Sequence, residues 1–247
     1  EIMPSLVGSE MCIRDRYLYS KMRLSAETNE GLNFYAQTVG VLYGLLMGLV
    51  AVSCWNNFDE LDVLVGQEVT AIGSFYRMSS GIQSAAASEL QASTLTYLDE
   101  VVNVEWPRYT EGMQANEVPQ SFLKMRNLLF KLRPENRYQE EVFQLLLSDF
   151  EKVIESRRLR INAFIDSGIP IVFWEVMLAG AILTIGLTYY VHFPSLLAHL
   201  SLTLIYCTSL GFMFFLIAVL DNPYRGDVRV SIEPYKTLYS NLKQGGN

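Results

Sequence analysis

Few side chains in this sequence have the types and the spacing that chemistry requires. The histidines His192 and His199 are seven residues apart and flank a short uncharged turn. A metal site would need carboxylate or thiolate partners, and none is near in sequence. We therefore expect interfacial, hydrogen-bonded roles for both imidazoles. The sequence has no glycine-rich phosphate loop, no zinc-type cysteine pair and no nucleophile motif, so it predicts no metal, no cofactor and no enzyme.

Polar positions in and beside the long apolar runs are the next candidates. Glu175 is the only formal charge in the two runs near the C-terminus, and an ionisable group inside a membrane is a functional hypothesis by default. Its place near one end of a run also allows a simple role at the lipid headgroups. Asp221 and Arg225 flank the last turn, and they could pair with each other or with the helical domain. Hydroxyl side chains in the runs are expected to donate hydrogen bonds between helices rather than line a path: Thr184, Thr188, Tyr206, Thr208 and Ser209.

These positions lie on or beside two apolar runs, 169–191 and 197–220, which are separated only by the turn His192–Ser195. As a helix, each run of about 22 residues is roughly 33 Å long, which is enough to cross a bilayer core. A helix also satisfies its own backbone hydrogen bonds in lipid. The pattern predicts a transmembrane hairpin. A buried soluble hairpin is the alternative, and it is disfavoured because both runs exceed the usual soluble helix length.

A third apolar block covers 36–58 and carries no charge from Val39 to Asn57. Trp55 and Phe58 near its end are typical of a membrane boundary. Three glycines recur every four residues and therefore share one helix face: Gly40, Gly44 and Gly48. This spacing favours close packing of another helix, or alternatively a face that flanks a pore. In the second case Val41 or Leu45 could form a hydrophobic constriction.

Residues 59–168 have a different composition, and we expect a helical domain there. The stretch 59–166 holds 17 acidic and 11 basic residues with helical periodicity. One amphipathic helix is predicted to run out of the first span through Leu61, Leu64, Val65, Glu68, Ile72, Phe75 and Tyr76. The charges of the domain are expected to form a solvated face.

Further helices are predicted within this domain. One covers Ser88–Glu105 and is expected to end at Pro107, before a loop from Arg108 to Pro119. Another covers Ser121–Leu132. A long helix covers Tyr138–Phe164, with a stripe through Val142, Leu145, Leu146, Asp149, Val153 and Ile154.

The C-terminal segment 221–247 is predicted to leave the last apolar helix at Asn222-Pro223, because the residue before proline avoids the α region. Arg225-Gly226 suits a turn, Val228–Ile232 alternates in an extended manner, and a short amphipathic tail follows. Residues 1–16 are expected to be foreign, because Ser5–Arg16 resembles a translated sequencing adapter, and 17–35 is expected to be a short loop. A first transmembrane helix would then be missing from this chain.

Composition limits the class of protein. The chain has 247 residues, a net charge of −7 and 50% apolar residues that are concentrated in three blocks. This profile is typical of a membrane protein with a polar domain, and the acidic balance argues against nucleic acid as a partner. Basic residues near the apolar runs place the helical domain and the C-terminus in the cytoplasm by the positive-inside rule: Arg157, Arg158, Arg160, Arg225 and Arg229.

Several motifs together resemble those of the bacterial bestrophin-like membrane proteins. They are Glu30-Gly31, the block Gly40–Trp55, Glu105-Trp106-Pro107, the run Arg157–Arg160 with Pro170 and Trp174, and above all the segment 221–234. The residues of that segment that match the family pattern are Asp221, Pro223, Arg225, Gly226, Arg229, Glu233 and Pro234. The resemblance implies an all-α, polytopic protein of the bacterial inner membrane with four spans, three of them present here. This family is distantly compared with the bestrophin anion channels.

Two functions remain open at this stage. The resemblance implies a homo-oligomeric channel in the lipid bilayer, with inorganic anions as the permeant species. The alternative is a membrane-anchored interaction or sensor protein whose cytoplasmic helices bind a partner, suggested by the Glu-rich surface of 138–160. A transporter is third, because transporters usually have more spans and broken helices.

Overall fold

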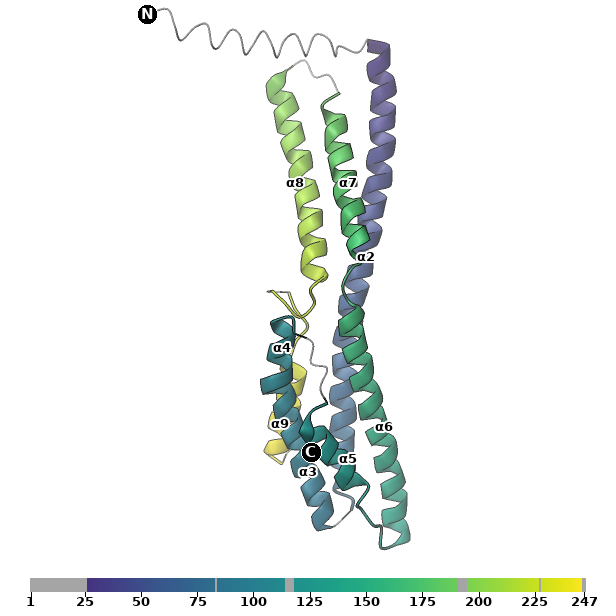
Figure 1. Ribbon diagram of the computed structural model, residues 1–247, viewed down its shortest axis with the longest axis vertical. Helices are drawn as coiled ribbons and strands as arrows, with labels where there is room; N and C mark the ends of the chain where they lie inside the picture. Colours follow the sequence, from purple (N-terminus) through teal and green to yellow (C-terminus); the bar gives the residue numbers. More distant parts are fainter. Residues whose placement is uncertain (1–25, 83, 114–117, 191–194, 227, 246–247) are drawn as a thin grey trace, which may run out of the picture. The chain divides into compact units, whose positions relative to one another are not determined.

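The computed structural model describes residues 26–82, 84–113, 118–190, 195–226 and 228–245. Every regular element among these residues is helical (Figure 1). In chain order they are α2 (Ala26–Ser79), α3 (Ala85–Glu100), the π-helical turn η1 (Val101–Glu105), α4 (Trp106–Thr110), α5 (Gln120–Leu129), α6 (Arg137–Asp166), α7 (Ile171–Thr188), α8 (Leu196–Leu220) and α9 (Glu233–Lys243). The all-helical prediction is confirmed.

The chain divides into two compact units. Unit 1 comprises Glu1–Val50 with Pro170–Phe215, and unit 2 comprises Ala51–Ile169 with Leu216–Asn247. By length and apolar composition, three helical stretches of the described residues can cross a membrane: Gly31–Ser79, Arg137–Thr188 and Leu196–Leu220. The residues of the predicted turn at 192–194 and of the segment 1–16 lie outside the described residues.

Unit 1 is held by a small number of contacts between α2, α7 and α8. The Tyr43 hydroxyl donates a hydrogen bond of 2.7 Å to the backbone oxygen of Met177. The Tyr43 ring lies against Gly180, where any side chain would overlap it. Trp174 stacks on Phe214 of α8. Most other large side chains of this unit are open, which a lipid-facing surface requires.

Unit 2 has a conventional apolar core built from α2, α3, α5, α6 and α9. The stripe predicted for α2 is confirmed at its core positions, since Leu61, Val65, Ile72 and Phe75 are fully buried. Phe122 of α5 stacks on Phe150 of α6. On α6 the prediction is wrong at two positions: Leu145 and Ile154 are exposed. They lie at the edges of the inward face, and its remaining positions already fill the core: Val142, Leu146, Phe150 and Val153.

Pro107 does not end the helix, contrary to the prediction. The path continues from α3 through η1 into α4, so the predicted loop from Arg108 begins with helix. The π-helical turn lets the Trp106 N–H bond to the carbonyl of Val101. Pro107 then occupies the first turn of α4, where its missing N–H is not needed.

Two other boundaries differ from the prediction. Helix α2 begins at Ala26, so the second half of the predicted loop 17–35 is helical; it contains no proline to interrupt the helix. In the C-terminal segment, no strand forms among the described residues of Val228–Ile232. Instead the buried Val230 donates its N–H to the carbonyl of Pro223, which closes the turn.

Candidate functional site

Four charged side chains meet in the interior of unit 2 and form what we call the ionic cluster. They are Glu68 of α2, Glu105 of η1, and Arg157 and Arg160 of α6. All four are buried, and Arg160 is completely inaccessible. The expectation that the charges of this domain form a solvated face is therefore wrong for these residues.

Glu105 bridges the two arginines. Its Oε2 lies 2.7 Å from Arg157 Nη2, and its Oε1 lies 2.6 Å from Arg160 Nη2. Arg160 also donates through Nε to Glu68 at 2.6 Å. Opposite charges are equal in number, so the cluster is formally neutral. Such a bonded, neutral arrangement is the condition under which charges persist away from water.

Two tyrosine hydroxyls complete the ionic cluster. Tyr97 receives a hydrogen bond of 2.8 Å from Arg157 and donates one of 2.8 Å to Glu68. Tyr109 donates to Glu105 at 3.1 Å. These phenols give the carboxylates additional donors, which lowers the energetic cost of burying them.

Local sequence explains why these side chains point inward. On α6 the buried residues Val142, Leu146 and Val153 follow the helical repeat, and Arg157 and Arg160 continue the same face. Glu68 occupies a core position of the α2 stripe, and Glu105 follows Val101 by four residues. The charged residues therefore stand where the periodicity requires apolar ones.

Electrostatics within the ionic cluster follow from burial and pairing. Burial by itself raises the pKa of Glu105, but the nearby Arg160 and Arg157 outweigh it and leave that pKa below its ordinary value. Burial disfavours the charged forms of Arg157 and Arg160. The nearby Tyr97 and Glu105 nevertheless raise the pKa of Arg157, and the nearby Glu68 raises the pKa of Arg160. Burial raises the pKa of the Tyr97 and Tyr109 phenols. At neutral pH the Glu105 carboxylate is therefore charged, and the Tyr97 and Tyr109 phenols are protonated.

The C-terminal segment covers this cluster with aromatic rings. Tyr224 packs on Trp106 with ring centroids 5.1 Å apart and on Phe164 at 4.9 Å. Tyr235 packs on Trp106 at 5.7 Å, and the guanidinium of Arg160 lies 5.9 Å from the Tyr235 ring. Within the described part of the chain, Arg160 Nη1 and the hydroxyls of Tyr224 and Tyr235 are buried without a well-formed hydrogen bond.

Asp221 and Arg225 anchor the C-terminal segment, but they do not pair with each other. Asp221 accepts a hydrogen bond of 2.6 Å from the N–H of Ile169. Arg225 donates to the carbonyl of Glu111 at 2.5 Å. Gly112, with φ of +78°, lies directly under the Arg225 guanidinium. The expected contact of Arg225 with the helical domain is therefore found, through the backbone at the end of α4.

The other C-terminal residues singled out from sequence have simpler positions. Pro223 is buried in the turn, Arg229 is exposed, and Glu233 pairs with Lys236 at 2.9 Å on the surface. Gly226 has φ of +80°, which fits glycine. Pro234 stands in the first turn of α9. No hydrogen bond or ion pair joins these five described residues to the ionic cluster.

In unit 1 the residues predicted to matter lie on open faces. A side chain added at Gly40, Gly44 or Gly48 would meet nothing within 4 Å, so none of the described helices packs there. Val41 and Leu45 are 71% and 60% exposed. Glu175 is exposed near the start of α7.

The expectation for the membrane hydroxyls is wrong for four of the five residues, and for Tyr206 it stays a prediction. Thr184, Thr188, Thr208 and Ser209 each donate to a backbone carbonyl three or four residues earlier in the same helix. A helix offers such carbonyls to Ser and Thr wherever they stand, without help from a second helix. Of the two histidines, His192 lies outside the described residues and His199 lies on α8.

Sequence reasoning named the members of the ionic cluster without bringing them together. A usable signal existed: Glu68 on one predicted core stripe, and two arginines continuing another. Opposite charges at core positions of two helices predict a buried pair. Among the described residues, no group of three or more His, Cys, Asp or Glu side chains could hold a metal ion.

A family model described as "Bestrophin-like domain" matches residues 3–235. The match extends over most of both units and includes the part of the C-terminal segment that carries Asp221, Tyr224 and Arg225. It begins inside 1–16, whose foreign origin stays a prediction. No curated protein and no solved structure matches the sequence.

Proposed function

We propose, from the premise that this chain belongs to the bestrophin-like family, that it forms a homo-oligomeric anion channel. Membership makes it an integral membrane protein, in agreement with the three membrane-capable helical stretches among the described residues. Bestrophins are anion channels, and the family relationship extends that activity to this chain as a proposal. The observation that favours it within the chain is the open glycine face of α2.

Copies of the chain would meet at Gly40, Gly44 and Gly48. The absence of side chains lets helix backbones approach closely, and no described residue of another helix occupies that face. Val41 and Leu45 project from the same stretch and are largely exposed, so in an assembly they would form an apolar constriction on the ion path. Inorganic anions such as chloride are the proposed permeant ions.

Current through planar bilayers containing the purified protein tests this proposal. We expect anion-selective currents from the wild type and increased conductance from Leu45→Ser, which would wet the constriction. Leu204→Ser is the matched control, because Leu204 is as exposed on α8 and has no place in the proposed path. A folded oligomer without current, or equal effects of both variants, contradicts the channel.

We place the chain in the bacterial inner membrane, with unit 2 and the C-terminus in the cytoplasm. Arg157 and Arg160 are neutralised by the ionic cluster, so the positive-inside argument rests on Arg158, Arg225 and Arg229, which are exposed. Labelling of a cysteine introduced at Arg229 tests this orientation. Reaction with a membrane-impermeant maleimide in intact spheroplasts would contradict it.

An interaction or sensor protein is the second candidate, and a groove between α2 and α6 favours it. This groove has a volume of about 740 Å³ and is lined by small residues of α2 such as Gly66 and Ala71, and by Leu159 of α6. Glu155 and Lys152 stand at the same site. Cross-linking from position 155 distinguishes the two functions: recovery of copies of this chain alone supports the channel, and a stoichiometric second protein supports the sensor.

A further inference from the structure

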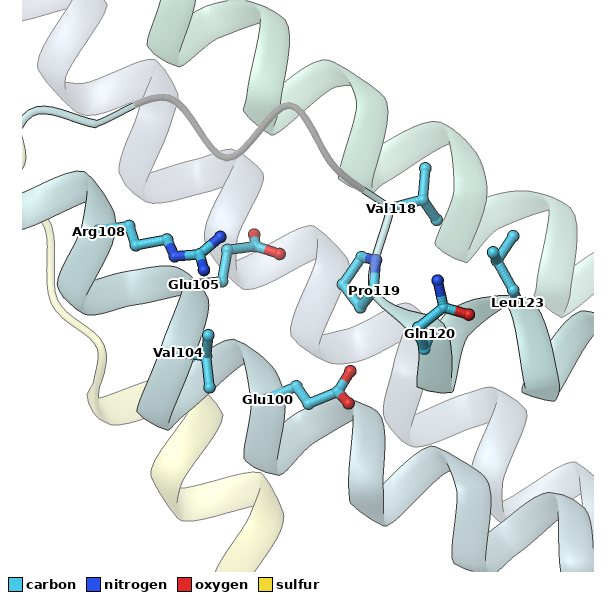
Figure 2. Close-up of a pocket in the computed structure, with 8 residues that line it drawn as sticks. All are labelled: Glu100, Val104, Glu105, Arg108, Val118, Pro119, Gln120 and Leu123. Atoms are coloured by element: carbon cyan, nitrogen blue, oxygen red, sulfur yellow. The ribbon is translucent and has the colours of Figure 1, made fainter.

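Unit 2 contains a cavity of about 490 Å³ beside the ionic cluster (Figure 2). One wall is the continuous helical path α3–η1–α4, which supplies Glu100, Val104 and Arg108. The facing wall is the start of α5 and the residues just before it, with Val118 and Leu123. This volume lies in the range of cavities that bind small molecules.

The π-helical turn explains why Glu100 and Arg108 share one wall. Along an α-helix, eight residues rotate by about 800°, which leaves the second side chain roughly 80° away from the first. A π-helical turn takes up about one additional residue, and so removes roughly 100° of that rotation. Glu100 and Arg108 therefore return to nearly the same face, and Figure 2 shows them with Val104 between them.

The charges in this cavity are asymmetric. Glu105 also lines it, but its carboxylate is neutralised by Arg157 and Arg160. Glu100 accepts a hydrogen bond from the Ser121 hydroxyl, which positions its carboxylate without cancelling the charge. Arg108 is exposed and forms no ion pair with any described residue. The cavity thus offers a ligand one carboxylate and one guanidinium.

Between these charges the lining is aliphatic. Val104 and Val118 are each 48% exposed, and Leu123 is partly buried. Because the π-helical turn takes up one of the eight residues, the helical wall rises by roughly 10 Å from Glu100 to Arg108, so the two charged groups are separated by an apolar stretch. An α-amino acid carries both charges on one carbon and spans this distance poorly.

We propose that this cavity binds a small linear zwitterion with an aliphatic middle, of the ω-amino acid class. The carboxylate of the ligand pairs with Arg108, and its ammonium group pairs with Glu100. Its methylene groups cover Val104 and Leu123, which removes exposed apolar surface from water. The contacts are charge-assisted at both ends, so the site discriminates by charge separation and length.

Isothermal titration calorimetry with 6-aminohexanoate as the probe tests the proposal on the full chain in detergent. We expect saturable binding, and at least tenfold weaker binding of hexanoate, hexylamine and norleucine. Arg108→Met and Glu100→Gln should each weaken binding of the probe at least tenfold. Arg133→Met is the matched control, because Arg133 lines a different cavity and should leave the affinity unchanged.

Three results would overturn the proposal: no saturable binding at millimolar probe, equal binding of all four compounds, or unchanged affinity in both cavity variants. Glu100→Gln retains a hydrogen-bond acceptor for Ser121, and near-ultraviolet circular dichroism shows whether it is folded. If it is unfolded, the exposed Arg108→Met decides by itself. The assay needs no ion current, so a chain that binds the probe but conducts nothing refutes the channel and not this site.

Discussion

The two units of this protein solve the problem of polar groups away from water in different ways. Unit 1 buries almost none: the Tyr43 hydroxyl uses a backbone carbonyl, and Thr184, Thr188 and Thr208 use their own helix. Unit 2 buries the four charged side chains of the ionic cluster, which pair with each other, and Asp149, which pairs with the exposed Lys152. In lipid each helix must be self-sufficient. A core packed from several helices can hold charges only if those helices supply partners simultaneously.

This difference predicts where a single substitution has large effects. In unit 2 each charged partner is supported by residues from other helices, so removing one leaves the rest uncompensated. In unit 1 the contacts within one chain are few, and the open faces of α2, α7 and α8 depend on lipid or on other copies. The following experiments examine the contrast.

The largest effect is expected from Arg160→Met, which leaves Glu68 and Glu105 short of a partner. Breaking a buried ion pair from one side costs about 3–5 kcal/mol of stability. Denaturant unfolding in detergent would be followed by Trp106 fluorescence in a chain with Trp55 and Trp174 replaced by Phe. Arg158→Met is the matched control, because Arg158 is the exposed neighbour on α6. Similar losses of stability in Arg160→Met and Arg158→Met would contradict the claim that the buried ionic cluster stabilises unit 2 more than an exposed charge does.

Alkaline pH should destabilise unit 2 by the next largest amount. Burial raises the pKa of Tyr97 and Tyr235 well above the ordinary value. A raised pKa means that stability is complete below about pH 10, where the unfolded phenols titrate, and falls as the pH rises. Each pH unit above about 10 costs roughly 1.4 kcal/mol per phenol, or about 3 kcal/mol for the two. Unfolding followed by Trp106 fluorescence at pH values between 9 and 11 measures this loss of stability. A free energy of unfolding that does not change over this range would contradict the burial of both hydroxyls.

A third prediction concerns unit 1. Gly180→Ala places a methyl group against the Tyr43 ring, and such overpacking costs about 1–3 kcal/mol. Gly186→Ala on the same helix meets nothing and should be neutral. The readout is Trp174 fluorescence during titration with dodecyl sulfate. Tyr43→Ala should abolish the difference between the two glycine variants; if it persists, the ring contact is not its cause.

Gly112→Ala should have an effect of about 1–2 kcal/mol, from a left-handed backbone and the overlap with Arg225. Gly226→Ala shares the backbone conformation, at φ of +80° against +78°, but has no neighbour within 4 Å. The difference between the two thermal midpoints therefore isolates the Arg225 contact. Combining Gly112→Ala with Arg225→Met should bring its midpoint closer to that of Gly226→Ala.

The smallest effect is expected for Lys236→Met, which removes the exposed pair with Glu233. Surface pairs of this kind contribute at most about 0.5 kcal/mol. The free energy of unfolding would be measured as for Arg160→Met. A loss of several kcal/mol would show that burial does not decide how much an ion pair contributes to the stability of this protein.

The sequence by itself determined the helical architecture, because periodicity and apolar run length are local properties. It placed α6 within two residues of its observed ends, at Arg137 and Asp166, and it identified the core stripe of α2. It missed the continuation past Pro107, since a π-helical turn depends on what packs around it. The residues of the ionic cluster were visible as charges on helices, but their helical positions alone did not say that they meet.

Only the tertiary structure decided which charges are solvated and which are paired. Glu68 and Arg160 are 92 residues apart, and the pairing of α2 with α6 brings them to 2.6 Å. Likewise, the contact of Arg225 with Glu111 spans 114 residues. A charge is stable inside a protein only when its partner is fixed there, and that partner comes from an element whose position no local pattern encodes.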